Sequence, residues 1–395
     1  MEWKVPLFDV DFQPREIAAV EAVLKSKWLT LGEVTQRFEE AFARYLEADH
    51  ALAVSSGTAA IHLSLLALGI GAGDEVITPS LTFVAAANSI LAVGARPVFC
   101  EIGGRDDWNI SPADIEKKIT PRTRAILIVH FAGFPCRMNE ILDLARSRRL
   151  AVIEDAAHAP GAEYRGKKCG GLGDAGCFSF FTNKNMTTGE GGMVVTNRED
   201  LAERIKLLRS HGMTSLTLDR HRGHNFTYDV VCPGFNYRID EMRSALGLCQ
   251  LEKLEGANQR RRELVDLYRE RLFGVKGVDL PFRAAPGTPA WHIFPILLNK
   301  SYPRRRMMEM LKRRGIQTSI HYRPIHLFRY YRRRFGYGPG LLPLTEEVGE
   351  REITLPLYPL MADGDVEYVC AAIRESLENM DVAIRRPGRE EARGR

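Results

Sequence analysis

Short β-rich runs alternate with helical patterns between residues 51 and 196, and this alternation constrains the fold more than any other feature of the sequence. The predicted strands are 51–55, 75–78, 97–102, 125–130, 151–154, 177–181 and 193–196. Helical patterns lie between several of them, at Thr58–Leu68, at Met138–Arg148 and after Ser111, whose side chain is expected to cap a helix. Such alternation predicts an α/β fold with a mostly parallel central sheet and helices on both faces. In these sheets ligands bind at the carboxyl ends of the strands.

The remainder of the chain predicts a second, smaller unit. An apolar stripe indicates one long helix from Asp240 to about Leu272, which would link the sheet to a smaller C-terminal α/β domain. We therefore expect an N-terminal arm that packs on the small domain, a large domain, the small domain and a frayed tail, at residues 1–45, 46–255, 256–385 and 386–395.

Composition narrows the classes of partner. The net charge of +5 and the isoelectric point of about 8.8 suit an anionic ligand but are too modest to indicate nucleic acid. Seven irregularly spaced cysteines indicate reduced thiols rather than a disulfide scaffold. The N-terminus lacks the pattern of a signal peptide, and no apolar run approaches the ~20 residues that span a bilayer. These features predict a cytoplasmic protein with no membrane or nucleic-acid partner.

Lys184 is the first candidate for chemistry. It follows the apolar run that ends at Phe181 and precedes a turn of small residues and glycines that ends at Gly192. This pattern places an amine in a loop at the end of a buried strand. A lysine desolvated there has a lowered pKa and can form an imine with an aldehyde. Taken alone, the pattern also fits an exposed loop lysine.

The segment Leu150–Ala159 adds a carboxylate and an imidazole. An apolar strand ends at Asp155, and His158 follows after two small residues. Pyridoxal phosphate (PLP) catalysis needs a carboxylate against the protonated pyridine nitrogen, which makes the ring an electron sink. The neighbouring Glu154 is expected to point to the other side of the strand. His158 fits either a packing role or a hydrogen bond to the 3-oxygen of the cofactor.

Two further strand ends fit the same ligand. Ser55-Ser56-Gly57-Thr58-Ala59 leads from a strand into a helix, where backbone N–H groups and a hydroxyl can bind a phosphate. A tight strand–helix turn without a ligand is the alternative. Phe83 follows another strand and is placed to stack on a pyridine ring, although it also suits an ordinary core position.

In this order the segments resemble the DegT/DnrJ/EryC1/StrS family of sugar aminotransferases, within the fold-type I PLP-dependent transferases. The resemblance continues through Gly234–Met242, Ala245–Gly247, His321–His326 and Leu355–Pro359, and so covers nearly the whole chain. No single motif is specific, but the ordered set is.

The resemblance implies a role for each matching residue. Lys184 would carry PLP as a Schiff base and move protons, and Asp155 would pair with the pyridinium. The other implied cofactor contacts are His158 at the 3-oxygen, Phe83 on the ring, and Gly57, Thr58, Ala59, Ser179 and Asn236 at the phosphate. The family supplies the Asn236 contact from a partner subunit, which implies a homodimer with shared active sites. The resemblance implies substrate contacts at Tyr322 and His326. The basic balance fits a substrate that carries a diphosphate, with Arg238 and Arg323 as further candidate contacts.

The implied activity is transfer of an amino group from an amino acid, with glutamate as the expected donor, to a nucleotide-linked keto-sugar. The pattern favours a 4-keto-6-deoxyhexose and a role in glycan or natural-product biosynthesis. Transfer to a keto-cyclitol or another non-nucleotide ketone is the main alternative. A sugar dehydratase is disfavoured because those relatives carry histidine where this chain has Lys184, and a regulatory protein without catalysis would need neither Lys184 nor Asp155.

Two further patterns in the sequence do not indicate a ligand site. Gly171–Gly176 fits a dinucleotide fingerprint, but a strand follows it where that motif requires a helix. His211, His221 and His224 lie in one polar segment without metal-ligand spacing, so we expect no metal.

Overall fold

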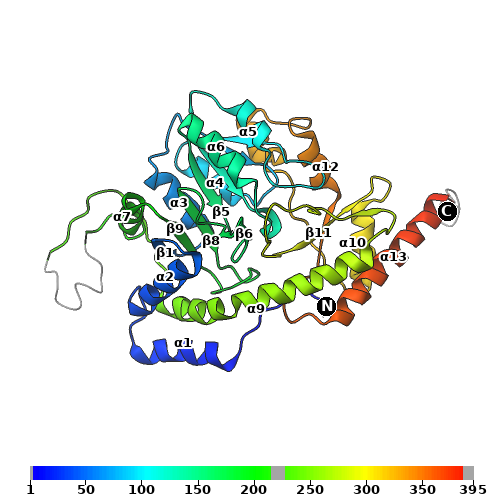
Figure 1. Ribbon diagram of the computed structural model, residues 1–395, viewed down its shortest axis with the longest axis horizontal. Helices are drawn as coiled ribbons and strands as arrows, with labels where there is room; N and C mark the ends of the chain where they lie inside the picture. The colour runs from blue at the N-terminus through cyan, green and yellow to red at the C-terminus, as the bar shows by residue number, and fades with distance from the viewer. Residues whose placement is uncertain (1–2, 215–226, 386–395) are drawn as a thin grey trace, which may run out of the picture.

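The central sheet lies at the middle of the molecule, with helices against both faces (Figure 1). The computed structural model describes residues 3–214 and 227–385, so the predicted tail at 386–395 lies outside the described residues, as do His221 and His224. The elements up to residue 208 are α1 (Pro14–Ser26), α2 (Glu33–Leu46), β1 (His50–Val54), α3 (Gly57–Ala67), β2 (Glu75–Pro79), α4 (Ala85–Ala92), β3 (Arg96–Cys100), α5 (Pro112–Lys118), β4 (Thr123–Val129), η1 (Phe131–Gly133), α6 (Met138–Arg148), β5 (Ala151–Asp155), β6 (Glu163–Tyr164), β7 (Lys167–Lys168), β8 (Ala175–Ser179), β9 (Gly192–Thr196) and α7 (Glu199–Leu208).

The sheet order is β1-β9-β8-β5-β4-β2-β3. Strands β3, β2, β4, β5 and β8 run parallel, and β9 runs antiparallel to both of its neighbours. Alternate residues of each strand face opposite layers. Ile126 and Ile128 of β4 pack with α2, α5, α6 and α9, whereas Ala125 and Leu127 pack with α3, α4 and α7. The predicted mostly parallel sheet with helices on both faces is confirmed.

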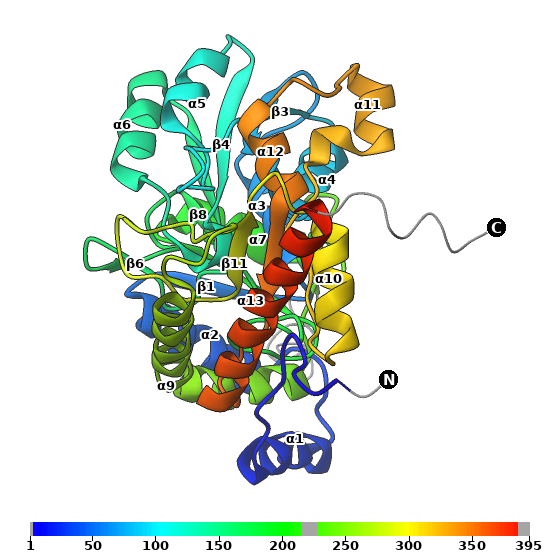
Figure 2. The same ribbon diagram turned by 90° about the vertical axis from the view of Figure 1, so that its right-hand side faces the viewer.

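A smaller antiparallel sheet of order β10-β11-β12 lies in the C-terminal part (Figure 2). The elements there are α9 (Glu241–Leu272), β10 (Val278–Asp279), β11 (Phe294–Leu298), α10 (Arg304–Arg313), η2 (Ile325–Leu327), α11 (Arg329–Phe335), α12 (Pro343–Arg351), β12 (Glu352–Leu355) and α13 (Asp363–Arg385). Helices α10 and α13 pack beside one another, and a large apolar core joins them to this sheet. The expected small C-terminal sheet is therefore present.

Helix α9 crosses the molecule from the central sheet to α13 (Figure 1). Asp240 caps its first turn by accepting a hydrogen bond from the Arg243 backbone N–H at 2.9 Å. Helix α2 packs closely on α9, since a Cβ built at Gly247 would lie 2.5 Å from the ring of Phe38. The predicted domain boundary at residue 255 falls inside this continuous helix, and the division into domains stays a prediction.

The N-terminal arm divides its contacts between two regions. Residues before α1 reach the C-terminal part, where Val5 pairs with Ile316 and the Leu7 N–H donates to Gln317 at 3.0 Å. The sequence predicts that the arm packs on the small domain. Helices α1 and α2 contact α9, and the assignment of the arm to a domain stays a prediction. The buried Glu241 carboxylate holds α2 there by accepting hydrogen bonds from the backbone and hydroxyl of Thr35.

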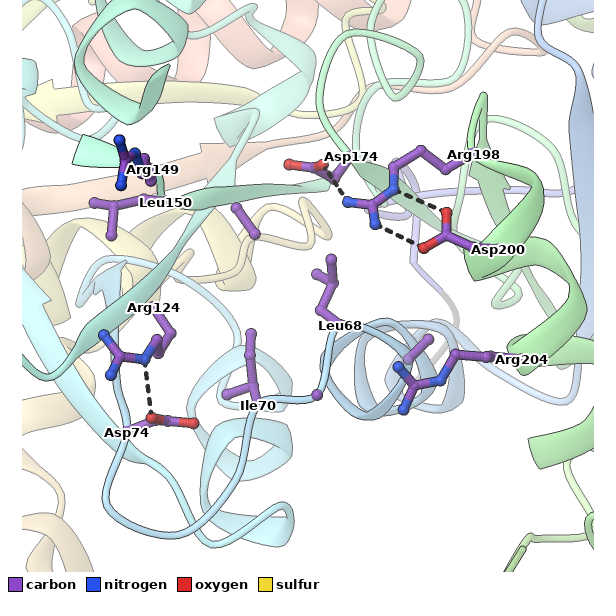
Figure 3. A pocket seen from close by; sticks show the side chains of 13 residues that line it. Leu68, Ile70, Asp74, Arg124, Arg149, Leu150, Asp174, Arg198, Asp200 and Arg204 are labelled. Carbon is purple, nitrogen blue, oxygen red and sulfur yellow. Dashed lines mark hydrogen bonds and ion pairs between the residues drawn. The ribbon is translucent and has the colours of Figure 1, made fainter. Parts of the chain in front are cut away.

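A cleft of about 470 Å³ opens at the amino ends of the central strands, opposite the ends where the sequence predicts the site (Figure 3). Two of the four arginines that line it have acidic partners, because Arg198 bonds Asp174 and Asp200, and Arg124 lies 3.4 Å from Asp74. None of the predicted site residues lines it. Among the described helices, none is long and apolar enough to cross a membrane. The cytoplasmic location stays a prediction.

Candidate active site

The carboxyl ends of β5 and β8 bring Asp155 and Lys184 together. Asp155 is the last residue of β5 and is 7% exposed, and its Oδ1 accepts a hydrogen bond from the Ala157 N–H at 3.1 Å. Burial raises the pKa of Asp155, and the Ala157 N–H and the charge of Lys184 oppose this rise. A buried carboxylate with a raised pKa fits a site that receives a cationic group.

Lys184 lies in the loop after β8 rather than on the strand itself. The loop is tightened by backbone hydrogen bonds from Lys184 to Phe181 and from Thr188 to Phe180, both at 2.9 Å. Burial lowers the pKa of Lys184 to about 8, and the charge of Asp155 partly opposes this change. A fraction of the amine is therefore neutral near pH 7, as a nucleophilic lysine requires.

Glu154 points away from Asp155, as the pleat of the strand requires. Its carboxylate is fully buried and accepts hydrogen bonds from the backbone N–H groups of Gly170, Leu172 and Gly173, and it bonds His130 at 2.9 Å. The glycine-rich segment that resembles a dinucleotide fingerprint is thus a loop that binds this carboxylate. We infer a structural role for Glu154.

The asparagine after Lys184 anchors the loop to α9 and to the chain before β11. The Asn185 amide N–H donates to Asn258 Oδ1 at 2.7 Å and to the Ala290 carbonyl at 2.6 Å, and its Oδ1 lies 3.0 Å from His292 Nδ1. Asn258 in turn donates to the Pro160 carbonyl at 2.9 Å. This network joins four segments of the chain and fixes where the loop carries Lys184.

Neutral imidazoles surround this position. His158 Nε2 lies 3.1 Å from the Tyr322 hydroxyl, and the His158 and His292 ring centroids are 4.3 Å apart. Burial and the charge of Lys184 lower the pKa of His158 far below its ordinary value. Among the described residues, the buried Nδ1 of His158 has no hydrogen-bond partner. The ring therefore retains one nitrogen for a ligand, as the predicted contact with the cofactor 3-oxygen requires.

His321 joins this group through a buried relay that the sequence did not predict. Its Nδ1 lies 2.8 Å from the Thr354 hydroxyl, and Thr354 donates to the Glu352 carboxyl group, which also accepts the His321 backbone N–H. Burial lowers the pKa of His321 to about 4 and raises that of Glu352 to about 8. Glu352 is therefore protonated over much of the neutral range.

Glu352 gives a pH-dependent prediction. The folded protein binds more protons at this group than the unfolded chain between pH 4.5 and about 8, so its stability falls as the pH rises through that window. We expect Glu352→Gln to be more stable than the native chain above pH 8, by at most about 5 kcal/mol. Urea denaturation at pH 5 and pH 9 measures the difference, with the exposed Glu350→Gln as the matched control. An identical pH dependence in the native chain and Glu352→Gln would contradict the prediction.

The predicted phosphate contacts other than Asn236 meet where α3 approaches the end of β8. Ser56 caps α3 by accepting the Ala59 N–H at 3.1 Å, so this amide is already bonded, while Gly57 and Thr58 form the first turn. A Cβ built at Gly57 would lie 2.9 Å from the Ser179 Cβ, so glycine permits this approach. The positive end of α3 and the Ser179 hydroxyl thus border one position suited to an anion.

Aromatic groups border the site on the side of Phe83. This ring is 58% exposed, and its centroid lies 6.2 Å from that of Tyr322. Burial raises the pKa of Tyr322 above its ordinary value, so its hydroxyl remains protonated. Arg323 is exposed, with its guanidinium 5.6 Å from the Phe328 ring centroid.

The remaining predicted contacts are those of His326, Asn236 and Arg238. The ring nitrogens of the fully buried His326 lie 2.8 Å from the Ser80 hydroxyl and 3.0 Å from the Glu346 carboxylate, so substrate contact would require a bond to break. Asn236 is exposed, and its backbone pairs with Ser210. Among the described residues, no hydrogen bond joins Asn236 or Arg238 to Lys184 or Asp155. These three predicted roles stay predictions.

Comparison with known proteins identifies the chain. A family model described as the DegT/DnrJ/EryC1/StrS aminotransferase family matches residues 11–374. The chain belongs to this family. It is therefore a member of the PLP-dependent sugar aminotransferases, and the resemblance noted from its motifs is confirmed.

Relatives of this aminotransferase match it over almost their full length. The spore coat polysaccharide biosynthesis protein SpsC of Bacillus subtilis is 40% identical, over 93% of this chain and 95% of its own. PseC of Helicobacter pylori, an aminotransferase involved in the biosynthesis of pseudoaminic acid, is 33% identical with a TM-score of 0.88, over 96% of this chain and 100% of its own. DesI, solved in the presence of its TDP-sugar product, is 30% identical with a TM-score of 0.86, over 97% and 95%.

The residues present fit the family's cofactor. PLP requires an amine for its aldehyde, a carboxylate for its ring nitrogen, a partner for its 3-oxygen and donors for its phosphate. Lys184, Asp155 and the unpartnered Nδ1 of His158 match the first three, and the first turn of α3 matches the last. The sequence missed Asn185, Asn258, His292 and the Thr354–Glu352 relay, because no local motif marks residues that meet only through tertiary packing.

Proposed function

We propose that this aminotransferase moves an amino group from an amino acid, with glutamate as the donor, to a nucleotide-linked 4-keto-6-deoxyhexose. The observation that carries the proposal is the pairing of Lys184, whose pKa is lowered, with the buried Asp155 at the carboxyl ends of β5 and β8. Its relatives support the substrate class, since DesI was solved with a TDP-sugar and PseC and SpsC serve sugar and polysaccharide biosynthesis.

Each polar group of the site would have a role in this amino-group transfer. When bound, PLP supplies an electron sink that stabilises negative charge on the substrate carbon. Lys184 Nζ would attach the cofactor and, once displaced by the donor, would take the proton from the donor Cα. Asp155 would keep the ring nitrogen protonated. His158, oriented by the Tyr322 hydroxyl, would bond the 3-oxygen, and the first turn of α3 with Ser179 would hold the phosphate.

The experiment that tests this function is an absorbance titration. The purified protein with PLP is expected to show a visible band that disappears when glutamate is added and returns with the correct keto-sugar. A panel of nucleotide-linked keto-sugars and a keto-cyclitol separates the proposed acceptor from the alternative. A band that glutamate leaves unchanged would reject this donor, and no band in folded protein would reject the assignment of Lys184.

We further propose that the enzyme is a homodimer with shared active sites. Among the described residues, no hydrogen bond joins Asn236 or Arg238 to Lys184 of the same chain, and Phe83 leaves 58% of its surface exposed beside the site. If a second subunit covers the surface beside Phe83, its Asn236 and Arg238 could make the predicted cofactor and substrate contacts.

Subunit mixing tests the dimer. Asn236→Ala and Lys184→Ala proteins are each expected to be impaired, whereas a mixed dimer should regain activity because one of its two sites receives both native residues. Activity is measured on heterodimers isolated with two different affinity tags. Verified heterodimers that remain as inactive as both parents would exclude sharing.

A further inference from the structure

The guanidinium of Arg261 is buried without an acidic partner. Arg261 lies in the middle of α9, is 4% exposed, and its Nη1 donates to the Leu357 carbonyl at 3.1 Å. Among the described residues its buried Nε has no hydrogen-bond partner, and no carboxylate forms an ion pair with it. Buried arginines are almost always paired, because an isolated charge is costly to remove from water. The unpaired cation therefore points to an anion that the chain itself does not supply.

Arg261 lies beside the lysine loop. It follows Asn258 by one helical turn and so shares its face of α9, the face that binds Asn185 next to Lys184. Arg261 and Lys184 line the same cavity, between the loop and the arm at Asp9.

The size of this cavity distinguishes between the two substrates. Its volume is about 40 Å³, which is room for a few water molecules or one carboxylate group. Pockets that enclose ligands of nucleotide size measure about 300–1,000 Å³. The cavity therefore has room for a carboxylate group of the donor and excludes the nucleotide part of the acceptor.

The other charges that line the cavity leave Arg261 available. Lys253 is occupied, because its Nζ bonds the Asp11 backbone at 2.6 Å and the Glu16 carboxylate at 2.5 Å. Asp9 and Asp11 oppose an incoming anion, but one Asp9 oxygen accepts the Val10 N–H at 2.8 Å, and the Asp11 carboxylate lies 3.3 Å from Lys253 Nζ.

We propose that Arg261 binds a carboxylate of the amino-acid donor through its unpartnered Nε–H and so holds the donor amino group beside Lys184. This inference rests on the proposed aminotransferase function. Burial lowers the pKa of Arg261 to about 10, so the side chain remains charged at neutral pH.

Binding of glutarate tests the role of Arg261, since this dicarboxylate lacks the amino group and cannot react. Calorimetric titration of the native protein, with and without PLP, is expected to show glutarate binding and no binding of the neutral glutaramide. Arg261→Met should weaken glutarate binding by about 10- to 100-fold, the value of a charge-assisted hydrogen bond. Arg261→Lys should weaken it by about tenfold, because it keeps the charge without the guanidinium geometry. The KM for glutamate should rise in parallel, while the KM for the keto-sugar stays unchanged.

Arg260→Met is the matched control. Arg260 is the preceding residue of α9, but its guanidinium bonds Asp363 at 2.7 Å on the surface, so glutarate binding should be unchanged. Native glutarate affinity in folded Arg261→Met would overturn the proposal. If that variant does not fold, native affinity in Arg261→Lys would overturn it equally. Glutarate binding that depends on Arg261 in a protein that converts no keto-sugar would reject the acceptor while supporting this site.

Discussion

Replacement of Lys184 by alanine is expected to abolish turnover, with a decrease of at least about 10⁴-fold. General acid–base catalysis alone contributes up to about that factor, and this residue is also proposed to attach the cofactor. The loop that carries Lys184 is fixed through Asn185 to Asn258 and Ala290, which holds the amine at this position. Amino-sugar formation and the visible absorbance of the protein with PLP measure the two roles separately, and both should be lost.

A matched lysine variant makes this result interpretable. Lys276 is exposed and does not line the cavity, so Lys276→Ala should retain native turnover and absorbance. Folding of both variants is compared by circular dichroism. Near-native turnover in Lys184→Ala would refute the assignment of the catalytic lysine.

Replacement of Asp155 by asparagine is expected to lower turnover by about 10³-fold. Asparagine has nearly the same shape and can still accept the Ala157 N–H through its oxygen, so the change removes the charge while preserving the packing. Removal of one partner from a buried charge pair costs about 3–5 kcal/mol, which corresponds to two to four powers of ten in rate. The rate at which glutamate bleaches the visible band measures this loss directly.

Attachment of PLP to Lys184 provides the internal control for the Asp155→Asn variant. Lys184 is unchanged in Asp155→Asn, so attachment of PLP should persist while the subsequent proton removal slows. A variant that attaches PLP and is bleached by glutamate within tenfold of the native rate would show that Asp155 does not stabilise the protonated ring.

The local sequence determined the elements of this fold and the two main groups of its site. Strand and helix alternation predicted the central sheet, Ser111 was placed correctly as a helix cap that accepts the Asp114 N–H, and the carboxyl ends of the strands were expected to hold the ligand. The apolar run at 177–181 set one strand end too late, since β8 ends at Ser179 and the chain turns at Thr182 and Asn183. Phe180 is buried by aromatic packing with Phe38 and Phe42 rather than by the sheet, and hydrophobicity alone does not distinguish the two.

Tertiary structure alone decided how distant segments complete the site. His292, His321 and Arg261 have no motif of their own and lie near Lys184 only because α9 and the loops around β11 and β12 fold back onto the central sheet. It also placed His326 in a buried bond with Glu346, although the motif suggested a substrate contact. Periodicity records which side of an element a residue faces, because neighbours in the chain share one backbone geometry. Contacts between elements depend on the tertiary path of the chain. Residues that are hundreds of positions apart can meet in the fold without any local sequence pattern that marks the contact.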